Sequence, residues 1–297
     1  MNPLLFAVSD LRTLRRLDYA RAYDARGETL EALDIYRSIT EDFGDWPPAW
    51  FEYGKALGDA GVDAFKRYLE LDPDDHMGAS LHLARLDALA APEKPPEAFI
   101  AALFDEYAER FEDALLTQLD YQAPQILSQF LGDGKFHTVL DLGCGTGLMG
   151  EAMIGQCYEI IGVDLSDEML KRAEEKQLYA ALHCGEVEDW LSHSKQSFDL
   201  IMAADVFSYF GALENVISLC ASKLRAGGTI AFTCEKARLD EDWYVRKTLR
   251  YGHSAAYIEG LLTQAGLTGI QISEAKLRMD EGAPIIGLYV IAHKLGD

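Results

Sequence analysis

Between Val139 and Gly147 the chain carries residue types that could hold a nucleoside-bearing cofactor. An apolar run leads into Asp141, and glycines follow at 143, 145 and 147. This pattern predicts a buried strand that ends in a loop with few side chains, where backbone can approach a ligand closely. A second apolar run ends at Asp164, and an acid at about this spacing accepts hydrogen bonds from ribose hydroxyls. Together these residues predict a cofactor site.

Two reading frames fit the glycines. The segment from Gly145 to Gly150 satisfies Gly-x-Gly-x-x-Gly, the dinucleotide fingerprint, and would indicate an NAD-dependent dehydrogenase. In that frame Asp141 has no role. The frame Asp141-x-Gly143-x-Gly145-x-Gly147 gives each of its residues a role. Asp164 would serve the nucleoside in both frames and leaves the choice open.

The second frame resembles motif I of the class I S-adenosylmethionine (SAM)-dependent methyltransferases. Further segments resemble that family in the same order: residues 164–170, the acid Glu186 after a short strand, the strand 198–203 and the turn 224–228. Across both halves the chain is similar to bacterial predicted methyltransferases with N-terminal tetratricopeptide-like repeats, including the phrase Arg-Tyr-x-His-Ser at 250–254.

This resemblance implies SAM as the cofactor and S-adenosylhomocysteine as its product. It implies that Asp141 holds the amino-acid end of SAM and that Asp164 accepts from the ribose. Glu186 stands where aspartate is more usual, in the place of the acid that accepts from the adenine amino group. The expected cofactor contacts are Asp141, Gly143, Cys144, Gly145, Gly147, Asp164, Leu165 and Met169 (these two beside the adenine), Glu186, Val187, Ala204, and Tyr107 from a covering helix.

The acceptor side is less defined. Methyl transfer needs a general base only when the acceptor begins protonated, as an alcohol, phenol or ammonium does. His253 is the side chain best suited to that role by its ordinary pKa. Tyr209 and Tyr251 are further catalytic candidates, as is Asp205. Arg278 could reach an anionic substrate, although a surface arginine with no special role is the plainer interpretation.

We therefore expect SAM-dependent methyl transfer to an unidentified small molecule. The alternative is a non-catalytic SAM-binding scaffold or sensor that recruits a protein through helical repeats. The acceptor atom stays open, because oxygen, nitrogen and carbon acceptors all use this scaffold.

The composition of the chain limits the classes of partner that we expect it to bind. The chain has 297 residues, 49 acidic against 27 basic side chains and a net charge of −22, which disfavours nonspecific nucleic-acid binding. Its five cysteines lack metal-ligand spacing and indicate reduced thiols, with no metal site expected. The apolar run from Leu4 to Val8 is too short for a signal peptide or a membrane span, so we expect a cytoplasmic protein with no membrane partner.

The chain divides into parts with different sequence patterns. Residues 1–91 carry two copies of a tetratricopeptide-like spacing, in which Ala32 and Tyr36 recur 32 residues later as Ala64 and Tyr68; a generic helical bundle is the alternative. Such repeats could bind a protein partner or a second copy. Residues 92–135 should form a linker and cofactor-covering helices, with a helical pattern over 99–119.

Residues 136–297 alternate strand and helix patterns, which predicts an α/β domain with a parallel sheet. The expected fold is the class I methyltransferase (Rossmann-like) fold, a seven-stranded sheet preceded by the all-α helical domain. Strands are expected near 138–142, 159–164, 179–183, 198–203, 228–234, 268–275 and 285–292. Residues 235–257 are interpreted as a substrate-shaping insertion, followed by a helix 255–265 that Ser254 caps.

Overall fold

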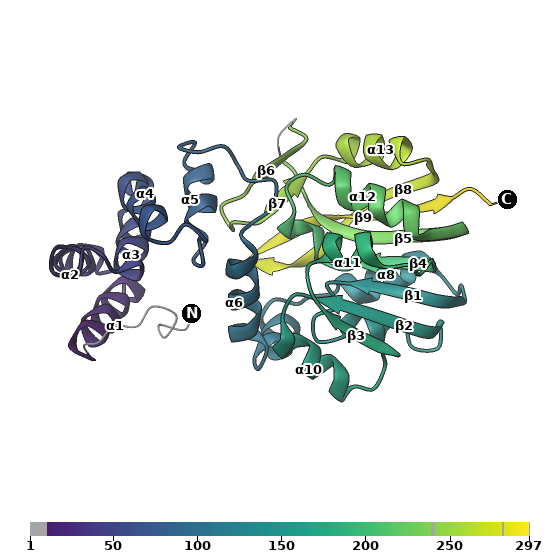
Figure 1. Cartoon of the computed structure of the whole chain (residues 1–297), viewed down its shortest axis with the longest axis horizontal. Coiled ribbons are helices and arrows are strands. Elements are labelled where there is room, and N and C mark those ends of the chain that lie inside the picture. The colour runs from purple at the N-terminus through teal and green to yellow at the C-terminus, as the bar shows by residue number, and fades with distance from the viewer. Residues whose placement is uncertain (1–10, 239–240, 281, 297) are drawn as a thin grey trace. The chain divides into compact units, whose positions relative to one another are not determined.

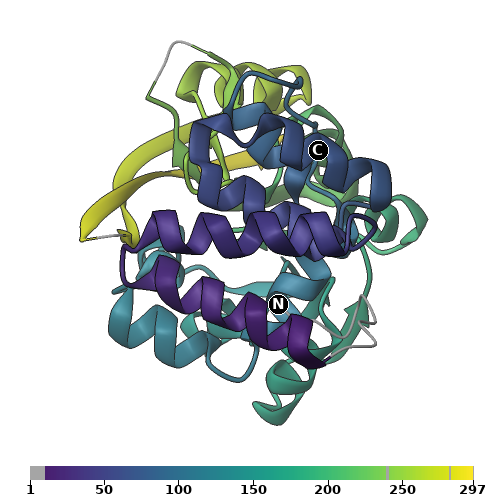
Figure 2. The ribbon, with the colours of Figure 1, turned by 90° about the vertical axis from the view of Figure 1, so that its left-hand side faces the viewer.

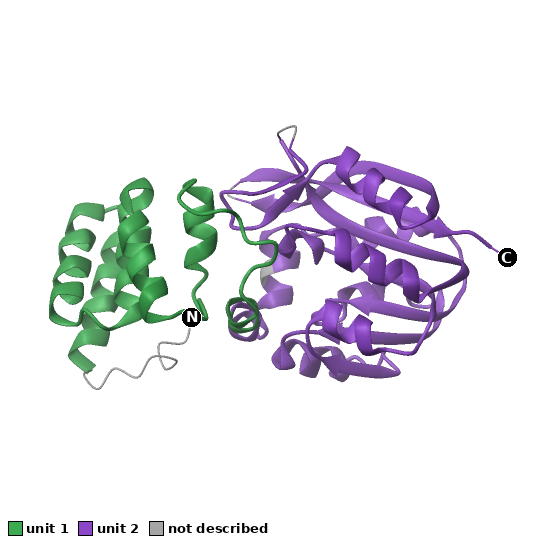
Figure 3. Cartoon of the chain, turned by 45° about the horizontal axis from the view of Figure 1, so that its top comes forward, with its two compact units in different colours: residues 1–102 green, residues 103–297 purple. Residues whose placement is uncertain are grey.

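A computed structural model describes residues 11–238, 241–280 and 282–296 of the chain, so the segment from Leu4 to Val8 lies outside the described residues. The chain forms two compact units, Met1–Ala102 and Leu103–Asp297 (Figure 3). The sequence places its boundaries at 91 and 135 instead. Among the described residues, no helix combines the length and the apolar character that a membrane crossing requires.

The first unit is built from helices that pack in sequence order, α1 on α2, α2 on α3 and α3 on α4 (Figure 2). Small and aromatic side chains fill the crossings: Ala32 and Ala64 are buried, and Tyr36 and Tyr68 are almost completely enclosed. The two residue pairs of the predicted repeat therefore occupy similar buried environments. The elements are α1 (Leu11–Ala25), α2 (Thr29–Asp42), α3 (Pro47–Leu57), η2 (Gly58–Ala60), α4 (Val62–Leu71) and α5 (Ala79–Arg85).

The helical character expected over 99–119 is confirmed for most of the segment, which the structure divides into shorter pieces. The segment forms α6 (Glu97–Tyr107), α7 (Phe111–Asp113) and one π-helical turn, η3 (Ala114–Gln118). In an unbroken helix, residues seven apart are separated by about 10.5 Å along the axis. The break allows the rings of Phe104 and Phe111 to meet with centroids 6.1 Å apart.

The second unit contains a nine-stranded sheet (Figure 1). Its strand order is β3-β2-β1-β4-β5-β7-β6, with β9 antiparallel to β5 and β8 paired with β9. The strands β1 to β5 are parallel neighbours, so their carboxyl ends meet at one edge. The strands are β1 (Phe136–Leu142), β2 (Cys157–Asp164), β3 (Ala181–Cys184), β4 (Phe198–Ala203), β5 (Leu224–Lys236), β6 (Trp243–Val245), β7 (Tyr251–His253), β8 (Leu267–Asp280) and β9 (Ala283–Lys294).

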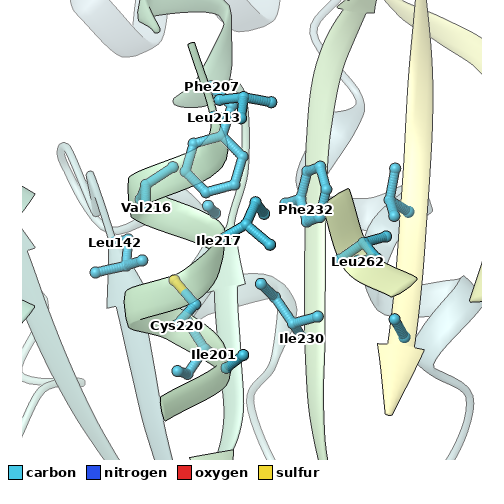
Figure 4. Close-up of a cluster of buried hydrophobic side chains, with 14 of the residues drawn as sticks. Leu142, Ile201, Phe207, Leu213, Val216, Ile217, Cys220, Ile230, Phe232 and Leu262 are labelled. Atoms are coloured by element: carbon cyan, nitrogen blue, oxygen red, sulfur yellow. The ribbon is translucent and has the colours of Figure 1, made fainter. Parts of the chain in front are cut away.

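Side chains alternate between two cores on the two faces of this sheet. Along β1, Leu140 joins one buried cluster and Val139 the other; along β4, Ile201 and Met202 divide in the same way. Figure 4 shows the first cluster, where α12 packs on the central strands. The helices are α8 (Ala123–Leu131), α9 (Leu148–Ala152), α10 (Asp167–Glu175), α11 (Val187–His193), η4 (Phe207–Tyr209), α12 (Glu214–Lys223) and α13 (Ala255–Gln264).

All seven predicted strands are present, but the predicted strand number is too low. The missing strands β6 and β7 lie in the segment interpreted as an insertion; each has three residues, too short for a periodic pattern to reveal. The predicted cap of α13 is confirmed, because the Ser254 hydroxyl accepts from the Tyr257 N–H at 3.2 Å.

Candidate cofactor and acceptor site

The glycine loop joins β1 to α9 at the carboxyl edge of the sheet. Gly143 has φ +58°, and a Cβ there would lie 2.5 Å from Cγ2 of Val206, so any side chain at this position would force Val206 to move. Gly145 has φ +53°, and the one atom near its missing Cβ is a ring carbon of Phe111 at 3.9 Å. The loop is thus packed tightly at one glycine and open at the next, as a backbone surface for a ligand requires.

Asp164 fixes this loop from the end of β2. Its Oδ2 accepts from the Gly145 N–H at 2.8 Å and its Oδ1 from the Ser166 N–H at 2.9 Å. Burial raises the pKa of the Asp164 carboxyl, and these backbone donors oppose that shift. A carboxylate has about four acceptor positions, so two backbone bonds leave acceptor capacity for ribose hydroxyls.

Asp141 is the last residue but one of β1, directly before the loop, and is 1% exposed. Its Oδ2 accepts from the Tyr179 hydroxyl at 2.7 Å. Burial raises the pKa of Asp141 to about 7, despite that hydrogen bond. Sequence reasoning did not find Tyr179, which lies 38 residues away and belongs to none of the recognised motifs.

Other expected cofactor contacts lie along the same edge. The Cys144 N–H donates to the Val163 carbonyl at 3.1 Å, which ties the loop to β2. Met169 is fully buried and Leu165 is half-buried. Their places beside the adenine stay predictions.

Glu186 has a local structural role at the start of α11. Its Oε2 caps the helix by accepting from the Asp189 N–H at 2.7 Å. Val187 follows it as the first, buried residue of that helix. Ala204, half-buried, follows β4, and its carbonyl accepts a long hydrogen bond from the Tyr121 hydroxyl at 3.5 Å. Their contacts with adenine or methionine groups stay predictions.

The segment Phe104–Asp113 covers the loop. The Ser166 hydroxyl donates to Asp105 Oδ1 at 2.6 Å, and Lys176 Nζ lies 2.6 Å from Glu112 Oε1. Phe111 supplies the ring beside Gly145. Tyr107, the expected contact from this segment, is 46% exposed, and its role stays a prediction.

Asp205 follows β4 in a strained backbone conformation, with φ +60°. Its N–H donates to the Thr233 hydroxyl at 2.8 Å, and the Ser208 hydroxyl donates to its carboxylate and its carbonyl, both at 3.1 Å. Non-glycine residues held in this region cost about 1–3 kcal/mol and cluster at functional sites. Its neighbour Val206 packs against Gly143, so Asp205 begins the acceptor side directly beside the cofactor loop.

Asp205 belongs to an arginine–carboxylate cluster with Glu235, Arg246, Arg250 and Arg278. Nη1 of Arg278 lies 3.0 Å from Asp205 Oδ2, and its Nη2 donates to Glu235 Oε1. Arg246 Nη1 lies 3.0 Å from Glu235 Oε2, a contact that has the distance of an ion pair but not hydrogen-bond alignment. Arg278 is 3% exposed and its Nη1 and Nη2 are engaged by carboxylates, so the surface interpretation is wrong for this residue. Its reach toward a substrate stays a prediction.

Of the three catalytic candidates, Tyr209 lies at this cluster. Its ring centroid is 5.0 Å from the guanidinium carbon of Arg250 and 5.2 Å from the ring centroid of Phe104. Burial raises the pKa of the Tyr209 hydroxyl, and the charge of Arg250 opposes that shift.

The other two candidates are core residues of β7. His253 is completely buried, its Nε2 lies 2.9 Å from the Gly211 carbonyl, and its ring stacks on Tyr257. Burial lowers the pKa of His253 to about 4, so its imidazole is neutral near pH 7. Tyr251 is also completely buried, with its ring edge against Trp243. Their contacts favour structural roles, and their catalytic roles stay predictions.

The segment that carries the glycine loop and both buried aspartates is similar to known methyltransferases. Residues 139–228 match the family model described as "Methyltransferase domain". The comparisons support a SAM-dependent methyltransferase domain. The ubiquinone biosynthesis O-methyltransferase of Idiomarina loihiensis is 32% identical over 106 residues, 34% of this chain and 44% of that protein. The malonyl-[acyl-carrier protein] O-methyltransferase of Salmonella typhimurium is 31% identical over 134 residues, 45% of this chain and 52% of that protein.

Two solved structures show the fold of the methyltransferase domain. The DhpI–S-adenosylhomocysteine complex has a TM-score of 0.51 at 19% identity, covering 66% of this chain and 96% of that one. Magnesium protoporphyrin IX methyltransferase (ChlM) of Synechocystis PCC 6803 with bound SAM has a TM-score of 0.50 at 15% identity, covering 67% and 96%. The chain spans about half the length of the curated relatives it matches.

Proposed function

We propose that the protein transfers the methyl group of SAM to a small-molecule acceptor. The carrying observation is the pair Asp141 and Asp164, two buried carboxylates at the ends of adjacent strands, on either side of a loop that is open at Gly145. These residues fit SAM, because a carboxylate suits its ammonium, a second suits its ribose and bare backbone suits its chain.

Each residue of the site has a defined task in this proposal. Asp141 would hold the ammonium of the methionine part, and its charged form would then be favoured by the opposite charge. Asp164 would accept from the ribose while keeping the loop in place. Bound SAM supplies an electrophilic methyl group on a cationic sulfonium. Phe111 would exclude water above the loop, since alignment and desolvation are the main demands of this transfer.

A general base is required only for a protonated acceptor. Tyr209 is the candidate that the geometry favours, because it lies beside Asp205 and Arg250 at the carboxyl edge. His253 and Tyr251 are buried in β7, so either could act as a base only after a movement of β7 that exposes its side chain.

The small-molecule acceptor is supported by the names of the relatives, a ubiquinone biosynthesis O-methyltransferase and a malonyl-[acyl-carrier protein] O-methyltransferase, the second of which names a small acyl group on a carrier protein. Nothing in these comparisons favours the scaffold alternative. We further propose that the helical unit is tetratricopeptide-like. It would provide a surface that binds a protein partner or a second copy of the chain. The five free cysteines fit a reducing cytoplasm.

Calorimetric titration of S-adenosylhomocysteine tests the proposal, with NAD as the competing ligand. Asp164→Ala should weaken binding by about 1.5–3 kcal/mol, the worth of a hydrogen bond to a charged group. Asp199→Ala is the matched control. Asp199 also accepts two backbone hydrogen bonds, from the N–H groups of His137 at 3.2 Å and Thr138 at 2.9 Å. It lies at the amino end of β4, whereas Asp164 lies at the carboxyl edge of the sheet.

Binding of the adenosyl ligand that only Asp164→Ala weakens would support the site, and labelled SAM with candidate acceptors would then detect turnover. If the folded wild type binds NAD instead, or binds neither ligand, the proposal is wrong. Equal losses in the two variants would mean that loop stability, not ligand contact, explains the effect.

A further inference from the structure

The arginine–carboxylate cluster carries more positive than negative charge. Counted over the described residues, three guanidinium groups, those of Arg246, Arg250 and Arg278, contact the carboxylates of Asp205 and Glu235, which leaves an excess of one positive charge. The chain as a whole has 49 acidic and 27 basic residues, so this local excess opposes the overall trend. A buried charge without a partner is costly, and this favours binding of an anion.

Arg250 holds that excess charge loosely. Its Nη1 lies 3.4 Å from Asp205 Oδ2 and 3.8 Å from Glu235 Oε1, both longer than the tight contacts of Arg278. Both carboxylate contacts run through the same nitrogen. Among the described residues the guanidinium donates one hydrogen bond, from Nη1 to Asp205, and none from Nε or Nη2. Its side chain is 23% exposed, whereas that of Arg278 is 3% exposed.

The guanidinium of Arg250 also contacts an aromatic ring. Its guanidinium carbon lies over the ring of Tyr209, 5.0 Å from the ring centroid, a cation–π contact that restrains the position of the group. A planar guanidinium with two nitrogens available binds a carboxylate through two parallel hydrogen bonds. Arg250 thus combines a restrained position, two nitrogens that donate no hydrogen bond to a described residue, and only long contacts to carboxylates.

Its position relative to the cofactor loop follows from the chain. Arg250 contacts Asp205, and the next residue, Val206, packs against Gly143. Tyr209 contacts Phe104, and Phe104 contacts the Phe111 ring that lies over Gly145. An anion on Arg250 would therefore lie at the carboxyl edge of β4 and β5, beside the loop that the proposed function gives to SAM.

We propose that Arg250 binds a carboxylate of the methyl acceptor, so that the acceptor class is a monoanionic carboxylic acid. This inference rests on the proposed function. One carboxylate neutralises the excess of one charge, whereas a phosphate dianion would leave the cluster negative. Arg246 and Arg278 hold Glu235 and Asp205 in place and do not themselves meet the acceptor.

The test uses the full chain saturated with S-adenosylhomocysteine, so that failure of cofactor binding is seen before any acceptor is added. Acetate, hexanoate, benzoate and phenylacetate are titrated, each beside its primary amide, with inorganic phosphate and phenyl phosphate as a second arm. The variants are Arg250→Met and Arg250→Lys. Arg225→Met is the matched control, because Arg225 pairs with Asp199 at 2.9 Å at the amino end of β4.

We expect at least one carboxylate to bind about tenfold to a hundredfold more tightly than its amide, as a charge-assisted pair implies. Arg250→Met should abolish that preference, Arg250→Lys should keep part of it, and Arg225→Met should keep all of it. Unchanged affinity for S-adenosylhomocysteine in Arg250→Met shows that the variant is folded.

Three results would overturn the inference while leaving the proposed function intact: no carboxylate preferred over its amide, a preference that survives in Arg250→Met, or phosphates that bind through Arg250 more tightly than carboxylates. Absence of S-adenosylhomocysteine binding would instead remove the proposed function itself.

Discussion

Gly143 shows how one missing side chain shapes the cofactor loop. Gly143→Ala would place a methyl group 2.5 Å from Cγ2 of Val206 at φ +58°. Gly155→Ala is the matched control, because Gly155 has φ +78° but nothing within 4 Å. Urea unfolding should show that Gly143→Ala costs about 1–3 kcal/mol more than the control, the usual penalty of overpacking. Val206→Ala in the Gly143→Ala background should restore part of the lost stability. Equal costs at Gly143 and Gly155 would show that the added methyl group does not collide with Val206.

Asp141 predicts a pH dependence of stability with a definite sign. Burial raises its pKa from 3.8 to about 7. Between these values the folded protein holds a proton that the unfolded chain has lost, so the free energy of unfolding falls as pH rises. Asp141→Asn should remove this slope and stabilise the unliganded protein at pH 8 by on the order of 2–4 kcal/mol. It should also weaken S-adenosylhomocysteine binding.

Asp199→Asn supplies a control of opposite sign for urea unfolding across pH. Burial opposes the charge of Asp199, but the Thr138 N–H and Arg225 outweigh it and lower its pKa. Asp199 therefore stabilises the wild type above its unfolded pKa, and that contribution is lost as pH falls. If Asp141→Asn and wild type keep parallel slopes between about pH 4 and 7, the carboxyl of Asp141 titrates normally and the prediction fails.

At the scale of elements, the segment Phe104–Asp113 is held over the loop by few contacts. Lys176 lies 2.6 Å from Glu112 and 3.1 Å from Glu151, and its side chain is 17% exposed. Lys176→Met should raise hydrogen exchange of residues 104–113 about fivefold, since a partly buried ion pair is worth about 1 kcal/mol. Lys171→Met is the control, because the ion pairs of Lys171 with described residues stay within α10, with Asp167 and Glu168. Equal hydrogen exchange of residues 104–113 in both variants would show that the ion pairs of Lys176 do not hold this segment.

The elements also show which features a sequence can predict. Parallel strands are buried on both faces, so their apolar runs are visible, and the runs ending at Asp141 and Asp164 located the cofactor loop. The arginine–carboxylate cluster was not foreseeable as a unit, because Asp205, Glu235 and Arg278 are up to 73 residues apart in the chain. They meet through the pairing of β4 with β5, of β5 with β9 and of β9 with β8. The positive φ of Asp205 leaves no signal in composition or periodicity.

At the scale of the molecule, the division into two units makes cofactor binding a local source of stability. A ligand stabilises only the unit whose folded state binds it, by about 2.7 kcal/mol at a hundred times its Kd. Two tryptophans lie in each unit: Trp46 and Trp50 in the first, Trp190 and Trp243 in the second. Each pair can therefore report on its own unit once the other pair is replaced by phenylalanine.

Saturating S-adenosylhomocysteine should raise the thermal midpoint reported by Trp190 and Trp243 by several degrees and leave that reported by Trp46 and Trp50 unchanged. The physical reason is that units with separate cores unfold as separate transitions, and the helical unit has clusters of its own. Asp164→Ala should remove the shift of the second unit while the first stays constant. If both pairs report one common shift, the units unfold together, and the helical unit would then depend on the cofactor-binding unit for its stability.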